Sequence, residues 1–246
     1  DLHSNKLFAF DYYDSILCGN TYHIKNLRAL EKLRNTPKKI LLETGCTYYD
    51  NYERHEDKIG ENVLIAPTWG DRSFFWSYGA QAINSLLSGG FYVKLRPHPQ
   101  SWISDIQKLT EIISLFKNNP LFSVDKNTSG SESLAQAKII ITDISSGIIY
   151  DFILLYKKLV VAVDFDAEVS GYESNYLTSK PCVWHLISEL GLIIQPECIS
   201  DLSQLIKSNY NHTIEDFDTE NHLFNFGQAG PIAAKQINNL FRSLKG

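Results

Sequence analysis

The feature that most constrains the fold of this chain is the regular alternation of two kinds of segment. Short, β-branched apolar runs recur along the chain, and the clearest is Ile139-Ile140-Ile141. Longer stretches with helical spacing of apolar residues lie between most of them. A run that is apolar at every position predicts a strand buried on both faces of a sheet. Strands that alternate with helices of this length form βαβ units, so the sequence predicts a parallel sheet.

The expected elements can be placed along the chain. Strands are expected at residues 15–18, 39–43, 62–66, 92–95, 122–124, 139–142, 160–164 and 192–194. Helices are expected at residues 24–34, 78–88, 102–117, 132–137, 148–155, 200–209 and 232–244. This pattern predicts an α/β protein with a Rossmann-like parallel sheet flanked by helices.

The chain is expected to divide near residue 59. Residues 49–58 are rich in charge and tyrosine and lack apolar periodicity, and a new strand is expected from residue 62. We therefore interpret residues 1–58 as the end of one α/β domain with a linker, and residues 59–246 as a second, complete domain. The first piece is too small for a Rossmann sheet of its own, so it is expected to be the remnant of a larger domain.

Composition excludes several classes of protein. The net charge of −5 argues against a surface that wraps nucleic acid, so no nucleic-acid partner is expected. The four cysteines form no Cys-x-x-Cys pair, which argues against a zinc site or a redox motif. Neither a metal nor a cofactor is expected. The sequence shows no run long enough to span a membrane and no signal peptide, so a cytoplasmic location is expected.

Three polar clusters follow expected strands, at the edge where parallel sheets bind their ligands. The first is Ala-Pro-Thr-Trp-Gly-Asp-Arg at residues 66–72. The hydroxyl of Thr68 and an arginine in such a loop can contact phosphate. The alternative is an ordinary strand-to-helix loop in which Trp69 is a hydrophobic plug.

The second cluster is Lys-Leu-Arg-Pro-His-Pro at residues 94–99. Two prolines bracket His98 and stiffen its backbone, which favours an imidazole that must be held in place. His98 can act as an acid or as a donor to a phosphate oxygen. Arg96 either pairs with phosphate or orients the loop. The alternative for His98 is a structural histidine in a proline-rich turn.

The third cluster is Thr-Asp-Ile-Ser-Ser-Gly at residues 142–147, before the helix expected from residue 148. Hydroxyls and backbone N–H groups at a helix N-terminus form an anion site. Candidate phosphate-binding residues here are Thr142, Asp143, Ser145, Ser146 and Gly147, although Asp143 is suited to orient the loop because a carboxylate repels diphosphate. The alternative is an N-cap by Ser145 or Ser146.

An acidic group, Asp164, Asp166 and Glu168, follows the next expected strand. Carboxylates placed in this way can bind a metal ion or a ribose. The alternative is a solvated loop, which we favour.

The three clusters, in this order and with Tyr-Asp-Phe at residues 150–152, resemble the CDP-glycerol glycerophosphotransferase family. Members of this family prime and polymerise teichoic acids, and relatives build capsules. Two further segments resemble it: Thr-Gly-Cys-Thr-Tyr-Tyr-Asp at 44–50, where Thr47 replaces the usual proline, and Asn-Phe-Gly-Gln-Ala-Gly at 225–230. The resemblance covers most of residues 11–240.

The resemblance implies a GT-B fold, in which two Rossmann-like domains face each other and the C-terminal one binds the donor. It implies transfer of glycerol phosphate, or a related polyol phosphate, from a CDP-activated donor to a hydroxyl of a teichoic-acid or capsule-type acceptor, with release of CMP. The donor would be a substrate rather than a cofactor. The acceptor would be a polyol phosphate or a glycan, and the family allows peripheral association with the inner face of the cytoplasmic membrane.

The resemblance also assigns roles to residues. His98 corresponds to the family histidine that contacts the donor phosphates and aids departure of the leaving group, so it is the catalytic candidate. Ser145 and Ser146 correspond to diphosphate contacts, and Thr68 and Arg96 are carried over as further donor contacts. The family's Trp-His-Gly segment, whose histidine is the expected base, is absent from this sequence. The acceptor-side half of the site is therefore expected to be missing from this chain.

Two other interpretations remain open. The first is a GT-B sugar transferase or a UDP-sugar epimerase, because fold alone does not separate these from a glycerophosphotransferase. The second is a nucleotide-binding module without catalytic activity.

Overall fold

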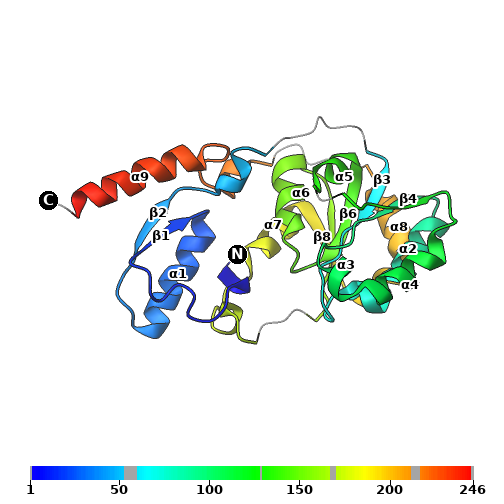
Figure 1. Ribbon diagram of the computed structural model, residues 1–246, viewed down its shortest axis with the longest axis horizontal. Helices are drawn as coiled ribbons and strands as arrows, with labels where there is room; N and C mark the ends of the chain where they lie inside the picture. Colours follow the sequence, from blue (N-terminus) through cyan, green and yellow to red (C-terminus); the bar gives the residue numbers. More distant parts are fainter. Residues whose placement is uncertain (1, 53–59, 128, 167–169, 212–216, 245–246) are drawn as a thin grey trace. The chain divides into compact units, whose positions relative to one another are not determined.

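The computed structural model describes residues 2–52, 60–127, 129–166, 170–211 and 217–244 (Figure 1). The chain forms two compact units. Unit 1 comprises Asp1–Glu53, Val169–Cys182 and Asp216–Gly246, and unit 2 comprises Arg54–Glu168 and Val183–Glu215.

Unit 2 contains a six-stranded sheet in which every pairing is parallel. Its strands are β3 (Asn62–Ile65), β4 (Tyr92–Leu95), β5 (Phe122–Val124), β6 (Ala137–Asp143), β7 (Val160–Val163) and β8 (Gly191–Ile194). Their order is β5-β4-β3-β6-β7-β8. Within this sheet the chain first forms the central strand β3 and then β4 and β5 on one side. It then returns to the centre and forms β6, β7 and β8 on the other side. The predicted parallel sheet flanked by helices is confirmed.

Helices cover both faces of this sheet (Figure 1). They are α2 (Phe74–Ser88), α3 (Ser101–Ser104), α4 (Ile106–Phe116), α5 (Ser131–Gln136), α6 (Ile148–Tyr156), α7 (Cys182–Leu190) and α8 (Leu202–Asn209), with a 3₁₀ turn η4 (Pro196–Asp201) before α8. Along β6, Ile139 and Ile141 belong to the core that α2, α4 and α8 cover. Ile140, which alternation places on the opposite face, is also fully buried, so the strand is covered on both sides.

The largest differences between the predicted and the observed helices concern α2, the segment 102–117 and α7. Helix α2 begins four residues earlier than expected, because the Ser73 hydroxyl accepts the backbone N–H of Phe75 and caps the helix. The single helix expected at 102–117 is two helices, α3 and α4, since Asp105 leaves the helical conformation (φ −124°, ψ 19°). Helix α7 was not expected. It runs directly into β8, so no loop marks its end.

Unit 1 has a parallel pair of strands, β1 (Ser15–Cys18) and β2 (Ile40–Glu43), beside helix α1 (Thr21–Arg34). Its other elements are the 3₁₀ turns η1 (Leu2–Ser4), η2 (Thr47–Tyr49), η3 (Glu173–Asn175) and η5 (Thr219–Asn221) and the helix α9 (Ala229–Ser243). Its small core includes Leu2, Leu27, Leu30 and Leu177, which come from the first and second of the unit's three segments.

The grouping of segments differs from the sequence-based division. Residues 170–182 pack with residues 2–52 rather than with unit 2. Glu173 is fully buried there, and its carboxylate accepts hydrogen bonds from the guanidinium of Arg34 and the backbone N–H of Phe8. Local periodicity carries no signal for such a pairing, because its two members are 139 positions apart. The expected boundary between residues 58 and 59 lies outside the described residues.

The two outlying segments of the resemblance meet in unit 1. The carboxylate of Asp50 accepts the backbone N–H groups of Ala229 at 2.9 Å and Gly230 at 2.6 Å, which satisfies the start of α9. Gly45 lies so close to the chain that a Cβ there would come within 2.1 Å of the carbonyl oxygen of Phe224. Residues 44–50 therefore pack directly against residues 224–230 and fix the start of α9.

Candidate functional site

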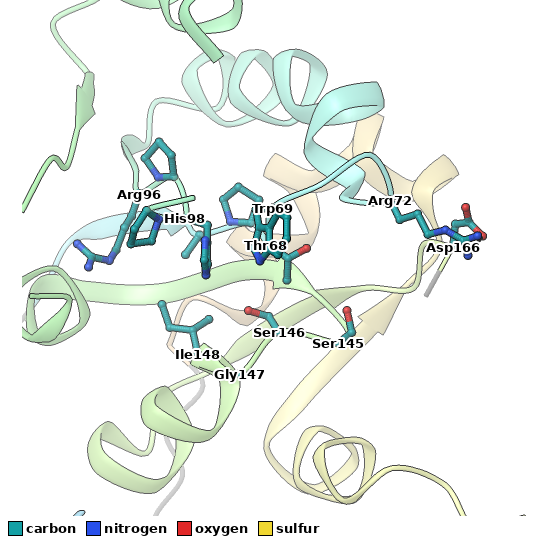
Figure 2. A pocket seen from close by; sticks show the side chains of 14 residues that line it. Thr68, Trp69, Arg72, Arg96, His98, Ser145, Ser146, Gly147, Ile148 and Asp166 are labelled. Carbon is teal, nitrogen blue, oxygen red and sulfur yellow. Dashed lines mark ion pairs between the residues drawn. The ribbon is translucent and has the colours of Figure 1, made fainter. Parts of the chain in front are cut away.

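A pocket of about 550 Å³ lies at the carboxyl ends of β3, β4 and β6 in unit 2 (Figure 2). It is lined by Ala66, Pro67, Thr68, Trp69, Arg72, Arg96, Pro97, His98, Pro99, Ser145, Ser146, Gly147, Ile148 and Asp166. The strand order reverses between β3 and β6, and parallel sheets open a ligand-binding crevice at such a point. All three clusters predicted from the sequence contribute to this one pocket.

Asp143 lies behind the pocket and organises its wall. Its carboxylate accepts hydrogen bonds from the backbone N–H of Thr68 at 2.7 Å, the Thr68 hydroxyl at 2.8 Å, the Ser73 hydroxyl at 3.1 Å and the backbone N–H of Phe74 at 2.7 Å. The side chain is buried and does not line the cavity. These contacts fit the loop-orienting role considered for Asp143, because they hold the β3–α2 loop against β6.

Thr142 also contributes to the fold around the pocket. Its side chain is fully buried, and its hydroxyl donates to the carbonyl oxygen of Ala66 at 2.6 Å. This bond ties the end of β3 to β6 inside the sheet. Thr68 does line the pocket, but both its N–H and its O–H are donated to Asp143. Neither threonine thus offers a hydrogen-bond donor to a ligand.

The guanidinium of Arg96 is bound by residues of the segment that follows β5. One nitrogen donates to Asp125 Oδ2 at 2.5 Å and to the carbonyl oxygen of Asn127 at 3.1 Å. Asp125 is buried and also accepts the Ser133 hydroxyl. Burial by itself would raise the pKa of Asp125, but the hydrogen bonds from Ser133, Asn127 and Arg96 and the charge of Arg96 lower it overall. Arg96 therefore fits the second role considered for it, orientation of the loop.

His98 stands at the pocket with its ring held in one tautomer. Its Nδ1 accepts the backbone N–H of Gln100 at 3.1 Å, so the proton of the neutral ring is on Nε2. Burial, and then the charge of Arg96, lower the pKa of His98 below its ordinary value. At neutral pH the ring is therefore uncharged, and it offers one N–H donor. Figure 2 shows it pointing toward the space above Ser146 and Ile148.

Ser145, Ser146 and Gly147 form the turn between β6 and α6. The backbone N–H of Ser146 donates to the carbonyl oxygen of Asp143, which closes the turn, and Gly147 precedes the first residue of the helix. No side chain caps α6, so the alternative of a serine N-cap is not observed. Within the described residues, neither serine hydroxyl has a hydrogen-bond partner. Two hydroxyls and the N-terminus of a nine-residue helix thus face the cavity.

Among the lining residues that were not predicted as site residues, three have charged or aromatic side chains: Trp69, Arg72 and Asp166. Arg72 reaches the cavity from the β3–α2 loop, and its guanidinium lies 3.6 Å from the Asp166 carboxylate, which follows β7. Trp69 is 53% exposed rather than a buried plug, and its ring centroid lies 6.2 Å from that of His98. The sequence held a signal for Arg72, because an arginine in this loop is suited to phosphate. Nothing in it indicated which arginine would face the cavity.

The described residues contain no group of three or more His, Cys, Asp or Glu side chains that could hold a metal ion. In the part of the chain that the structure describes, no helix combines the length and apolar character needed to cross a membrane.

Comparison with known proteins places the fold. No family model matches the chain, and no curated protein matches it. Among solved structures, the pneumococcal O-GlcNAc transferase GtfA in complex with UDP and GlcNAc matches 95% of the chain with a TM-score of 0.56 and 12% identity. A Listeria monocytogenes protein solved as a candidate UDP-N-acetylglucosamine 2-epimerase matches 91% with a TM-score of 0.56 and 13% identity. The α/β architecture thus matches that of GT-B glycosyltransferases.

The chain spans about half the length of these structures, 46% of the first and 58% of the second. A wall teichoic acid polymerase, TagF, also matches 92% of the chain and 59% of its own length, with 16% identity and a TM-score of 0.47. That similarity is too low to carry weight for fold or substrate.

Proposed function

We propose that the pocket in unit 2 binds the diphosphate of a nucleotide-activated donor, and that the donor is a CDP-activated polyol such as CDP-glycerol. The observation that carries the proposal is the convergence of Ser145, Ser146 and His98 at the reversal point of the sheet. Their donors are directed at the cavity rather than used within the fold, whereas those of Thr68, Thr142 and Arg96 are used within it. Uncommitted donors at a helix N-terminus suit phosphate oxygens.

The choice of a cytidine donor rests on the resemblance of the spaced motifs to CDP-glycerol glycerophosphotransferases. In that reaction an acceptor hydroxyl attacks the β-phosphorus of the donor, the bond from this phosphorus to the bridging oxygen breaks, and CMP leaves with that oxygen. Phosphoryl transfer requires positioning and neutralisation of charge more than covalent help. The serine hydroxyls and the start of α6 would stabilise the negative charge on departing CMP. The Nε2–H of His98 would donate to an oxygen of the same diphosphate.

The proton of the acceptor hydroxyl must go to a base, and none of the pocket residues has that role. Asp166 is the only carboxylate among the lining residues, and it faces Arg72. We therefore propose that unit 2 supplies the donor half of the reaction, and that a base outside this pocket completes it.

A second candidate function has one observation in its favour. The solved structures that match best among those above are those of an O-GlcNAc transferase with UDP and of a candidate UDP-sugar epimerase. A uridine donor would use the same phosphate groups of the pocket, so the nucleobase decides between the two functions.

The test is a thermal-shift titration of this chain with CMP, CDP, UMP and UDP. We expect cytidine nucleotides to raise Tm by several degrees at saturation and uridine nucleotides to do so less, because a ligand that binds only the folded state stabilises it by mass action. His98→Ala and Ser145→Ala/Ser146→Ala should weaken CDP binding by roughly tenfold or more, since each removes hydrogen bonds to a charged group. Ser188→Ala, an exposed serine outside the pocket, is the matched control. Equal stabilisation by uridine nucleotides would favour the second candidate, and no stabilisation by any nucleotide would reject both.

A further inference from the structure

Arg72 and Asp166 form an ion pair inside the candidate site. Both residues line the pocket, and they reach it from different elements, Arg72 from the loop after β3 and Asp166 from the segment after β7. Their closest nitrogen–oxygen distance is 3.6 Å. The side chains keep 50% and 63% of their exposure, so water competes for both charges.

The other charged groups of the pocket are fixed or neutral. Arg96 is bound to the buried carboxylate of Asp125, and His98 is a neutral donor. Figure 2 shows Ser145 lying between Ser146 and the Arg72–Asp166 pair, so the polar groups follow one another along the pocket. An anion with two phosphate groups on the serine turn would extend toward the pair.

We propose that Asp166 is a counter-ion of Arg72, and that a bound diphosphate displaces Asp166 and interacts with the guanidinium instead. An exposed ion pair is worth little, so the exchange costs little. A guanidinium binds two phosphate oxygens at once, which gives the incoming diphosphate the stronger interaction. Asp166 thereby competes with anions for Arg72 and lowers the affinity of the pocket for them modestly. The inference rests on the proposed function in requiring a ligand that carries a diphosphate.

Inorganic diphosphate is the appropriate probe, because it has no base and its binding does not depend on the choice between cytidine and uridine. We expect Asp166→Asn to tighten diphosphate binding by about two- to fivefold in isothermal titration calorimetry, since an exposed ion pair of the usual strength is removed. Asparagine tolerates the positive φ of 26° at this position, so the loop is expected to keep its conformation. Arg72→Ala should weaken binding about tenfold.

The double variant distinguishes a counter-ion from a general charge effect. In an Arg72→Ala background, Asp166→Asn should change the affinity far less than in the wild type, because the partner it releases is absent. Asp71→Asn is the matched control: this carboxylate adjoins Arg72 in sequence, pairs with Lys108 at 2.9 Å and does not line the pocket. It should leave the affinity close to that of the wild type.

Three outcomes would overturn the inference. They are weaker or unchanged binding by Asp166→Asn, an equal gain from Asp71→Asn, or no diphosphate binding by any variant. None of them depends on the nucleotide titration, so the inference and the identity of the donor can fail separately.

Discussion

At the scale of single residues, the role of each polar group in the pocket follows from where its hydrogen bonds are already used. Arg96 and Arg72 are both arginines in loops that follow a strand of the same sheet. Arg96 is bound to a buried carboxylate at 2.5 Å, whereas Arg72 is paired with an exposed one at 3.6 Å. The first is part of the fold, whereas the ion pair between Arg72 and Asp166 is exposed enough for a ligand to compete with Asp166. His98 is intermediate, because Nδ1 is used by Gln100 and Nε2 remains available.

The first prediction concerns the charge of His98. Because its pKa is lowered, the ring is a neutral donor at pH 7, and a neutral amide can replace it in part. His98→Gln should therefore retain more CDP affinity at pH 7.5 than His98→Ala. As the pH falls through the lowered pKa, the wild-type ring gains a proton and attracts phosphate, while glutamine does not. The ratio of wild-type to His98→Gln affinity should thus be constant above pH 7 and rise on acidification.

Binding of CDP measured by calorimetry between pH 5 and 8 would check this. Using the ratio removes the titration of the nucleotide itself, because both proteins meet the same ligand. A ratio that rises toward alkaline pH, or glutamine no better than alanine at pH 7.5, would contradict the neutral-donor role.

At the scale of elements, the site is built by ties between strand ends. Asp143 at the end of β6 fixes the loop that leaves β3 and the first turn of α2, and Thr142 joins the same two strands. These ties hold the β3–α2 loop, which carries Trp69 and Arg72, above the turn that carries Ser145 and Ser146. The Asp143 carboxylate, which accepts four hydrogen bonds, therefore fixes the β3–α2 loop relative to the β6–α6 turn.

The second prediction is that Asp143→Asn destabilises unit 2 and weakens ligand binding together. An amide cannot accept from all four donors, and its own N–H₂ group would face some of them, which should cost about 2–3 kcal/mol of unfolding free energy. Urea unfolding and CDP titration of the same variant would measure both effects. Asp71→Asn, which removes an 89% exposed carboxylate, should change stability by less than about 0.5 kcal/mol. Loss of stability without loss of affinity would show that the loop does not depend on Asp143.

At the scale of the whole molecule, the chain passes between the two units several times. It begins in unit 1, and each of the two segments of unit 2 is followed by a return to unit 1. The segment 170–182 is fixed to unit 1 by the buried carboxylate of Glu173 and by Leu177 in the core. Arg34 forms ion pairs with that carboxylate and with Asp11, and its guanidinium lies 4.6 Å from the centre of the Phe8 ring. Burial by itself would lower the pKa of Arg34, but its hydrogen bonds to Glu173 and Asp11 and the charges of both carboxylates raise it overall.

The third prediction is that Glu173→Gln loosens unit 1 as a whole. Replacing the buried carboxylate with an amide weakens its hydrogen bonds to Arg34, which keeps Asp11 as a partner, and should cost about 1.5–3 kcal/mol. Hydrogen exchange should accelerate in residues 2–52 and 170–182 together, while the strands of unit 2 keep their protection. The matched control is Glu111→Gln, an exposed glutamate on α4. Acceleration confined to residues 170–182 would show that this segment is not part of the cooperative unit.

The sequence alone determined the class of fold and indicated the edge of the sheet at which the candidate pocket lies. Buried strands have continuous apolar runs in the sequence, and runs that alternate with helices indicate a parallel sheet. Each of the eight predicted strands corresponds to a strand within the described residues. Residues at the carboxyl ends of such strands must meet at one edge, which is why clusters far apart in the chain could be assigned to one pocket.

Only the tertiary structure decided which of those residues face the cavity. Whether Arg96 or Arg72 is available to a ligand depends on Asp125 and Asp166, and whether Asp143 touches the ligand depends on four donors from another segment. It also decided that residues 170–182 belong with residues 2–52. The physical reason is common to all three: periodicity reports how a segment buries its own apolar side chains, whereas hydrogen bonds and ion pairs between distant segments depend on positions that only the folded chain brings together.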